Sequence, residues 1–221
     1  MISSDRQGMP IFVQVIHPDA ATDVKPHTTG KIADMFRTSN QRSMAVWSAV
    51  FVLSQANIVR LLGPVGPRVL EVQTAFSARR YREVLAKMDG AETARFRSHY
   101  YPDFVHPAIY AVALRAAGRR LGERTPLSPT VRKALAAAPV LSAAGDYVEN
   151  IAGLYLLDHR DNITDRTVRI TTAVSISKWV LALGTLGYLS QGFVRVWVAT
   201  GVAFRSASQW PGGRRNRVEE Y

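Results

Sequence analysis

Two carboxylates stand inside an otherwise apolar stretch of this chain. The run from Ala134 to Leu157 is rich in Ala, Leu and Val, and its only charged residues are Asp146 and Glu149. A helix that crosses a bilayer needs about 20 residues, so the run is long enough to span one. Charged side chains in such a segment are costly and usually face a bundle interior or a water-filled cavity. This pair is therefore the first candidate for a functional site.

A buried carboxyl beside a second carboxyl can keep its proton at neutral pH. In that state Asp146 or Glu149 could act as a general acid on an apolar substrate. The structural alternative is that Glu149 pairs with Lys178 and fixes helix packing, because one buried charge without its partner is costly. The sequence holds no GxSxG, Walker, HExxH or GxGxxG motif, so no particular reaction is indicated.

Four apolar segments predict four membrane spans, at residues 44–63, 104–118, 134–157 and 170–204. Together they form a predicted transmembrane domain over residues 43–204. The predicted fold is an all-α integral membrane four-helix bundle, with an amphipathic helical hairpin between helices 1 and 2. The alternative is a soluble all-α domain with long buried helices, which the basic residues inside the predicted spans would favour.

The segments outside the spans are polar. Residues 1–42 contain prolines and scattered charges, which predict a mostly irregular cytoplasmic tail. After the first span, apolar residues recur at helical spacing up to the turn signal Asp89-Gly90, and residues 91–100 could form a second short helix. We interpret these two helices as the hairpin, lying on one membrane face. Residues 205–221 form a basic C-terminal tail.

Alternating helix directions would bring polar residues of all four spans to one leaflet. At a rise of about 1.5 Å per residue, Glu149 and Lys178 both lie roughly 12 Å below the same membrane face. Asp146, Glu149 and Asn150 share one helix face, because they are three and four residues apart. The first two spans add further polar residues at this end: Asn57, Arg60, Asp103, His106 and Tyr110.

These residues predict a polar chamber that opens under the hairpin. It could cradle a lipid head group, with three hairpin arginines at its mouth: Arg79, Arg80 and Arg82. Structural alternatives stay open for single members. Asn150 could simply hydrogen-bond across helices, His106 could be a structural histidine, and Asp103 could only cap the second helix. Nothing in the spacing requires a metal ion, and we expect neither a metal nor a cofactor.

The amino-acid composition limits which kinds of partner are expected. The chain has no cysteine, which excludes disulfides, Cys-ligated zinc, iron–sulfur clusters and thiol catalysis. Its net charge of +11 fits an anionic membrane surface better than nucleic acid, because the basic residues flank the apolar runs. No cleavable signal peptide is visible near Met1. The positive-inside rule favours cytoplasmic termini. We therefore expect a multi-pass protein of the cell inner (plasma) membrane that contacts lipid and no nucleic acid.

Four motifs occur in the chain in a fixed order. They are TAFSARRYREVL (74–85), YYPDFVHPAIYAVAL (100–114), GDYVENIAGLYLL (145–157) and ISKWVLALGTLG (176–187). Over roughly residues 45–190 the chain resembles a family of small, largely uncharacterised bacterial four-helix membrane proteins with a D-x-x-E-N core motif. The resemblance implies the fold but no activity. Its matched positions are Asp103, Asp146, Glu149, Asn150 and Lys178.

Two functions follow from these patterns. The first is a non-enzymatic inner-membrane protein, an accessory or scaffold subunit of an envelope or lipid-handling complex, in contact with lipid and with other membrane protein subunits. The second is an integral-membrane enzyme of the terpenoid cyclase or isomerase type, with Asp146 or Glu149 as the proton donor. A small transporter is disfavoured, because four spans without an internal repeat are few for one.

Overall fold

The computed structural model describes residues 27–208, and the side chains of residues 38–200. The described part contains helices and no strand, which confirms the all-α prediction. The four long helices are α1 (His27–Leu62), α5 (His106–Arg124), α6 (Pro129–Asp158) and α7 (Asp165–Ser208). The shorter elements are η1 (Gly63–Val65), α2 (Gly66–Gln73), α3 (Ala78–Ala86), α4 (Gly90–Asp103) and η2 (Arg160–Asn162).

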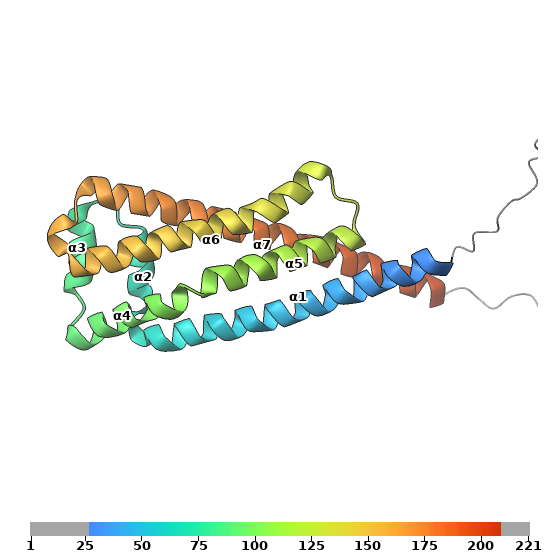
Figure 1. Ribbon diagram of the computed structural model, residues 1–221, viewed down its shortest axis with the longest axis horizontal. Coiled ribbons are helices and arrows are strands. Elements are labelled where there is room, and N and C mark those ends of the chain that lie inside the picture. Colours follow the sequence, from blue (N-terminus) through green and yellow to red (C-terminus); the bar gives the residue numbers. More distant parts are fainter. Residues whose placement is uncertain (1–26, 209–221) are drawn as a thin grey trace, which may run out of the picture.

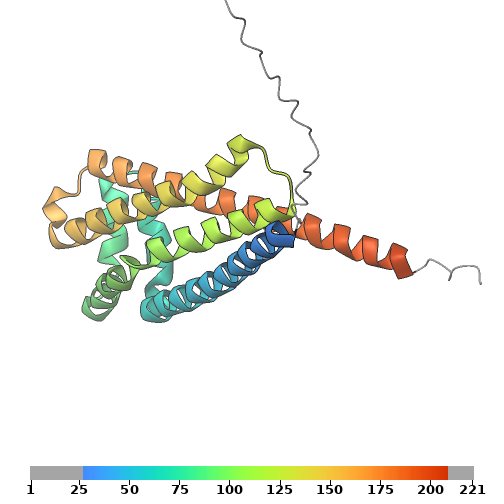
Figure 2. The same cartoon turned by 45° about the vertical axis from the view of Figure 1, so that its right-hand side comes forward.

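The long helices lie side by side and alternate in direction (Figure 1). α1 packs on α5, α5 packs on α6, and α6 packs on α7. In the described part of the chain, α1 and α7 make little or no contact with each other. The helices therefore form a curved row with an open side between its first and last members. The beginning of α1 and the end of α7 lie at the same end of the molecule (Figures 1 and 2).

A cap of three short helices closes the opposite end. We call α2, α3 and α4 the cap; Figure 1 shows them gathered around the end of α1 and the start of α7. The largest hydrophobic core lies here, built on fully buried side chains that include Val84, Leu85, Phe96 and Leu156. Local capping fixes the helix starts: the Ser77 hydroxyl accepts from the Arg80 N–H at 3.2 Å at the beginning of α3. The predicted hairpin corresponds to α3 and α4, with Asp89 as the N-cap of α4.

The start of the first long helix differs substantially from the prediction. α1 begins at His27, so residues 27–42, predicted as irregular, are helical. The prolines responsible for that prediction end at Pro26, and nothing after it in this segment blocks a helix. Residues 1–26 and 209–221, which include most of both predicted tails, lie outside the described residues.

Two stretches of helix are long and apolar enough to cross a membrane. Within the described residues they are Thr38–Gln73 and Asp165–Thr200, and only 11% and 22% of their most apolar windows are buried inside the protein. A core helix of a soluble protein would be mostly buried. The exposed faces instead carry large apolar side chains, among them Leu53, Val180 and Trp197. α5 and α6 are less apolar, so two helices of the described part of the chain are long and apolar enough to cross a membrane, where four were predicted.

The Asp89 capping box predicts a local stability effect. Asp89 accepts from the Glu92 N–H at 2.7 Å, and the Glu92 carboxylate accepts from the Asp89 N–H at 3.2 Å. Asp89→Ala removes the acceptor of the Glu92 N–H and should cost about 1 kcal/mol. We expect faster hydrogen exchange in the first turn of α4, while Asp89→Ser should keep near-wild-type protection. Equal protection in all three proteins would contradict this role.

Candidate functional site

One buried ammonium lies between two carboxylates at the centre of the bundle. Lys178 of α7 is 5% exposed, and its Nζ pairs with Asp146 and, at 3.0 Å, with Glu149 Oε1. Both acids come from α6, three residues apart, so they present to the same neighbouring helix. The ion pair expected between Glu149 and Lys178 is present. The contact with Asp146 was not anticipated, and it makes Lys178 the counter-ion of both acids.

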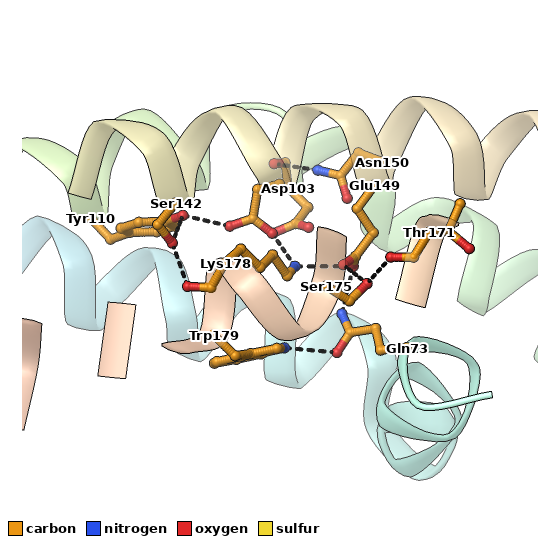
Figure 3. A network of polar contacts seen from close by, with 11 residues as sticks. Gln73, Asp103, Tyr110, Ser142, Glu149, Asn150, Thr171, Ser175, Lys178 and Trp179 are labelled. Carbon is orange, nitrogen blue, oxygen red and sulfur yellow. Dashed lines mark hydrogen bonds and ion pairs between the residues drawn. The ribbon is translucent and has the colours of Figure 1, made fainter. Parts of the chain in front are cut away.

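Tyr110 and Ser142 complete the side nearest Asp146. The Tyr110 hydroxyl donates to Asp146 Oδ2 at 2.7 Å and lies 2.9 Å from the Ser142 hydroxyl. Ser142 donates to the backbone carbonyl of Lys178 at 2.8 Å. Three helices, α5, α6 and α7, are thereby joined around one carboxylate. Figure 3 shows Tyr110 and Ser142 at the backbone end of Lys178, while the Lys178 ammonium points toward Glu149.

The side nearest Glu149 is completed from the cap and from α7. Gln73 donates from Nε2 to Glu149 Oε1 at 2.6 Å, and the Ser175 hydroxyl donates to Glu149 Oε2. Gln73 Oε1 in turn accepts from the indole of Trp179 at 3.0 Å (Figure 3). We call Gln73, Tyr110, Ser142, Asp146, Glu149, Ser175 and Lys178 the Lys178 cluster. It ties the cap to the long helices.

Asp103 and Asn150 lie beside the Lys178 cluster. The Asn150 amide donates to the backbone carbonyl of Asp103 at 2.9 Å, and its Oδ1 is buried without a hydrogen-bond partner. Burial raises the pKa of the Asp103 carboxyl, at the end of α4, to about 6, and the nearby Asp146 adds to the rise. Asp103 does not cap α5, whose N-cap is Val105 without a side-chain hydrogen bond. Asn150 therefore forms a hydrogen bond between two helices, α6 and α4, which was the structural alternative predicted for it.

Two residues expected in the chamber lie elsewhere. Arg60 is exposed and donates to Asn57 at 3.2 Å on the outer side of α1, and neither residue lines the cavity described below.

His106 is buried, contacts Ser54 at 2.9 Å through Nδ1 and stacks on Phe51. It therefore joins α5 to α1 rather than to the acids.

The hairpin arginines are engaged on the cap surface and not at the cavity. Arg79 pairs with Glu83 at 3.3 Å, Arg80 pairs with Glu71 and Glu83 at 3.4 and 3.8 Å, and Arg82 donates to the carbonyl of Ile163 at 2.7 Å. None of the three arginines lines the cavity. The structure therefore does not place these arginines where they could bind a head group at the cavity entrance.

A cavity of about 700 Å³ runs along the open side between α1 and α7. Its volume is in the range of small-molecule sites, about 300–1,000 Å³. Some of its lining side chains are largely exposed, Val59 of α1 and Leu183 of α7 among them, so it opens laterally between these two helices. The Lys178 cluster contributes to its wall, together with Asp103, His99 and His106.

Polarity changes along the cavity. Near the cap its wall carries Gln73, Glu149 and Lys178, whereas farther along α7 it carries Ala182, Leu186, Leu189 and Phe193. From Lys178 to Phe193 the helix rises about 22 Å. One leaflet of a bilayer is about 15 Å thick in its hydrocarbon part. The cavity thus has a polar end under the cap followed by an apolar arm, and its full length along α7 exceeds one leaflet.

Sequence reasoning missed Gln73, Ser142 and Ser175. Ser142 precedes Asp146 by four residues and Ser175 precedes Lys178 by three, which places each on the same helix face as its neighbour in the cluster. This spacing was a usable signal. Gln73 carried none, because it reaches the acids only through the way the cap folds over the bundle.

Comparison with protein-family models, with curated proteins and with solved structures finds no match to this chain. The site must therefore be interpreted from its own geometry. Its acids are held by many donors, and in the described residues no three His, Asp or Glu side chains come together as a metal site would need. The arrangement suits the binding of a molecule with one polar end and one long apolar part.

Proposed function

We propose that this protein is a non-enzymatic membrane protein that holds a lipid molecule in the cavity between α1 and α7. It would serve as an accessory or scaffold subunit of an envelope or lipid-handling complex. The observation that carries the proposal is the cavity itself, which is apolar over most of its length, polar at one end and open on its side. A lipid could enter from the bilayer through the open side without leaving the apolar phase.

The membrane setting is part of the proposal. Two long apolar helices with few buried residues support it, and so do the exposed apolar side chains of α6, such as Leu141 and Ile151. We propose four spans formed by α1, α5, α6 and α7, both termini in the cytoplasm and the cell inner membrane as the location. We also propose that the chain is related to the small bacterial four-helix membrane proteins whose motifs it resembles.

The hydrogen bonds of the acids favour binding over catalysis. A general acid needs a proton on an oxygen that reaches the substrate. Each carboxylate oxygen of Asp146 and Glu149 already accepts a hydrogen bond or an ion pair from the protein. The enzymatic alternative, in which one of these acids protonates an apolar substrate, would require this network to rearrange. We therefore place it second.

Filling the cavity provides the test. Ala182 lines the apolar arm, so Ala182→Phe should block a bound chain. The matched control is Val180→Phe, because Val180 lies on the outer face of the same helix and is 66% exposed. Mass spectrometry of the protein purified in gentle detergent should find a specific lipid with wild type and Val180→Phe, and at least about tenfold less of it with Ala182→Phe.

Two outcomes test the two parts of the proposal, lipid binding in the cavity and the accessory role. A lipid that remains at full occupancy in Ala182→Phe would contradict binding in this cavity. Stoichiometric membrane proteins that co-purify with all three forms would support the accessory role and identify the complex.

A further inference from the structure

We propose that the cavity prefers a single-chain amphiphile with a cationic amine head group over an anionic lipid. This inference rests on the proposed function, since it names the class of ligand for the same cavity. Three features of the cavity wall support it: its charge, its free acceptor atoms and its shape.

Negative charge dominates the polar end. Three carboxylates line it, those of Asp103, Asp146 and Glu149, whereas Lys178 is the one Lys or Arg among the described lining residues. His99, also at the wall, adds no positive charge at neutral pH, because burial lowers its pKa to about 4. Charges interact strongly where water is excluded. A phosphate or carboxylate head group would meet net repulsion here, and an ammonium would meet attraction.

Free acceptors are concentrated on Asp103. The Lys178 ammonium is already shared by Asp146 and Glu149, so little of its donor capacity remains for an anionic ligand. Both carboxylates have their oxygens occupied by protein donors. The Asp103 carboxylate lines the cavity and, among the described residues, forms no ion pair; the neighbouring Asn150 amide is its side-chain donor, and a carboxylate has further acceptor positions for a ligand. We assign it as the group that accepts the hydrogen bonds of the ligand's ammonium.

The shape of the cavity favours one chain. About 700 Å³ suits a small molecule and not the two chains and head group of a phospholipid. Along α7 the cavity extends about 22 Å, from Lys178 at its polar end to Phe193 in its apolar arm, by the rise of the helix. One extended hydrocarbon chain with its head near Asp103 would therefore occupy it.

Three probes with the same chain test the preference: hexadecylamine, hexadecanol and hexadecanoate. Each is titrated at pH 7 into the full-length protein in mild detergent, and bound probe is counted by native mass spectrometry. We expect hexadecylamine to bind at least about tenfold more tightly than hexadecanoate, with hexadecanol between them. The whole chain carries +11, so non-specific attraction would favour the opposite order.

Asp103→Asn should remove most of the amine's advantage and leave hexadecanol binding unchanged. The control is Asp161→Asn, which deletes the same charge from an exposed residue in η2 and should preserve the wild-type order. Hexadecanoate binding as tightly as hexadecylamine in wild type would overturn the proposal, and so would an unchanged amine affinity in Asp103→Asn. If no probe binds to wild type, or if Ala182→Phe binds all three normally, the proposed function itself fails.

Discussion

Replacing Lys178 by methionine should destabilise the protein by about 3–5 kcal/mol, the cost of leaving buried charges without a partner. Lys178 is 5% exposed and is the counter-ion of both Asp146 and Glu149. Methionine keeps much of the chain length, so the loss measures charge and not packing. The free energy of unfolding can be measured by titration with sodium dodecyl sulfate in mixed micelles, followed by circular dichroism.

Two further variants distinguish charge from other causes. Lys133→Met removes the same charge from an exposed residue near the start of α6 and should leave stability within about 0.5 kcal/mol of wild type. Adding Asp146→Asn and Glu149→Gln to Lys178→Met should recover much of the loss, because the two acids that Lys178 neutralised are then uncharged. A Lys178→Met protein as stable as wild type would show that the cluster is not needed as a counter-ion system.

Gly153→Ala should destabilise the protein by about 1–3 kcal/mol, the usual cost of overpacking. A Cβ at this position would lie 2.7 Å from Cζ and 2.9 Å from Cε1 of the Tyr100 ring, which is 4% exposed and cannot easily move. Glycine here lets α6 approach α4 closely. The same detergent titration measures the loss, and α4 should show faster hydrogen exchange.

Gly184→Ala is the matched control for this substitution. Nothing lies within 4 Å of a Cβ at Gly184, so alanine should be neutral there or stabilise α7 by up to about 1 kcal/mol. If Gly153→Ala behaved like Gly184→Ala, the close contact with Tyr100 would have no energetic weight.

The level at which each polar residue lies along the bundle was predictable from the sequence. The rise per residue and the alternating directions placed Glu149 and Lys178 at the same level, and the two side chains meet there. The apolar runs likewise located the four long helices. These inferences work because helix rise is fixed by backbone hydrogen bonding and does not depend on neighbours.

Rotation about the helix axis was not predictable. Asn57 and Arg60 lie at the expected level of α1 but on its outer side, because Ile58 and Leu62 turn inward instead. Which face of a helix packs is decided by its neighbours, and a span with apolar residues all round gives little indication of it. The role of Gln73 depends in the same way on the cap, whose position over the acids is a tertiary feature.

The row order of the helices gives the bundle an uneven local stability. α1 rests on α5, and at its end on α4, whereas α6 is held by a neighbour on each side. Separating α1 breaks fewer interfaces than removing α6, and segments with fewer contacts open at lower free energy. We therefore expect α1 to open at the lowest free energy, which would widen the entrance to the cavity while Asp146, Glu149 and Lys178, on α6 and α7, stay together.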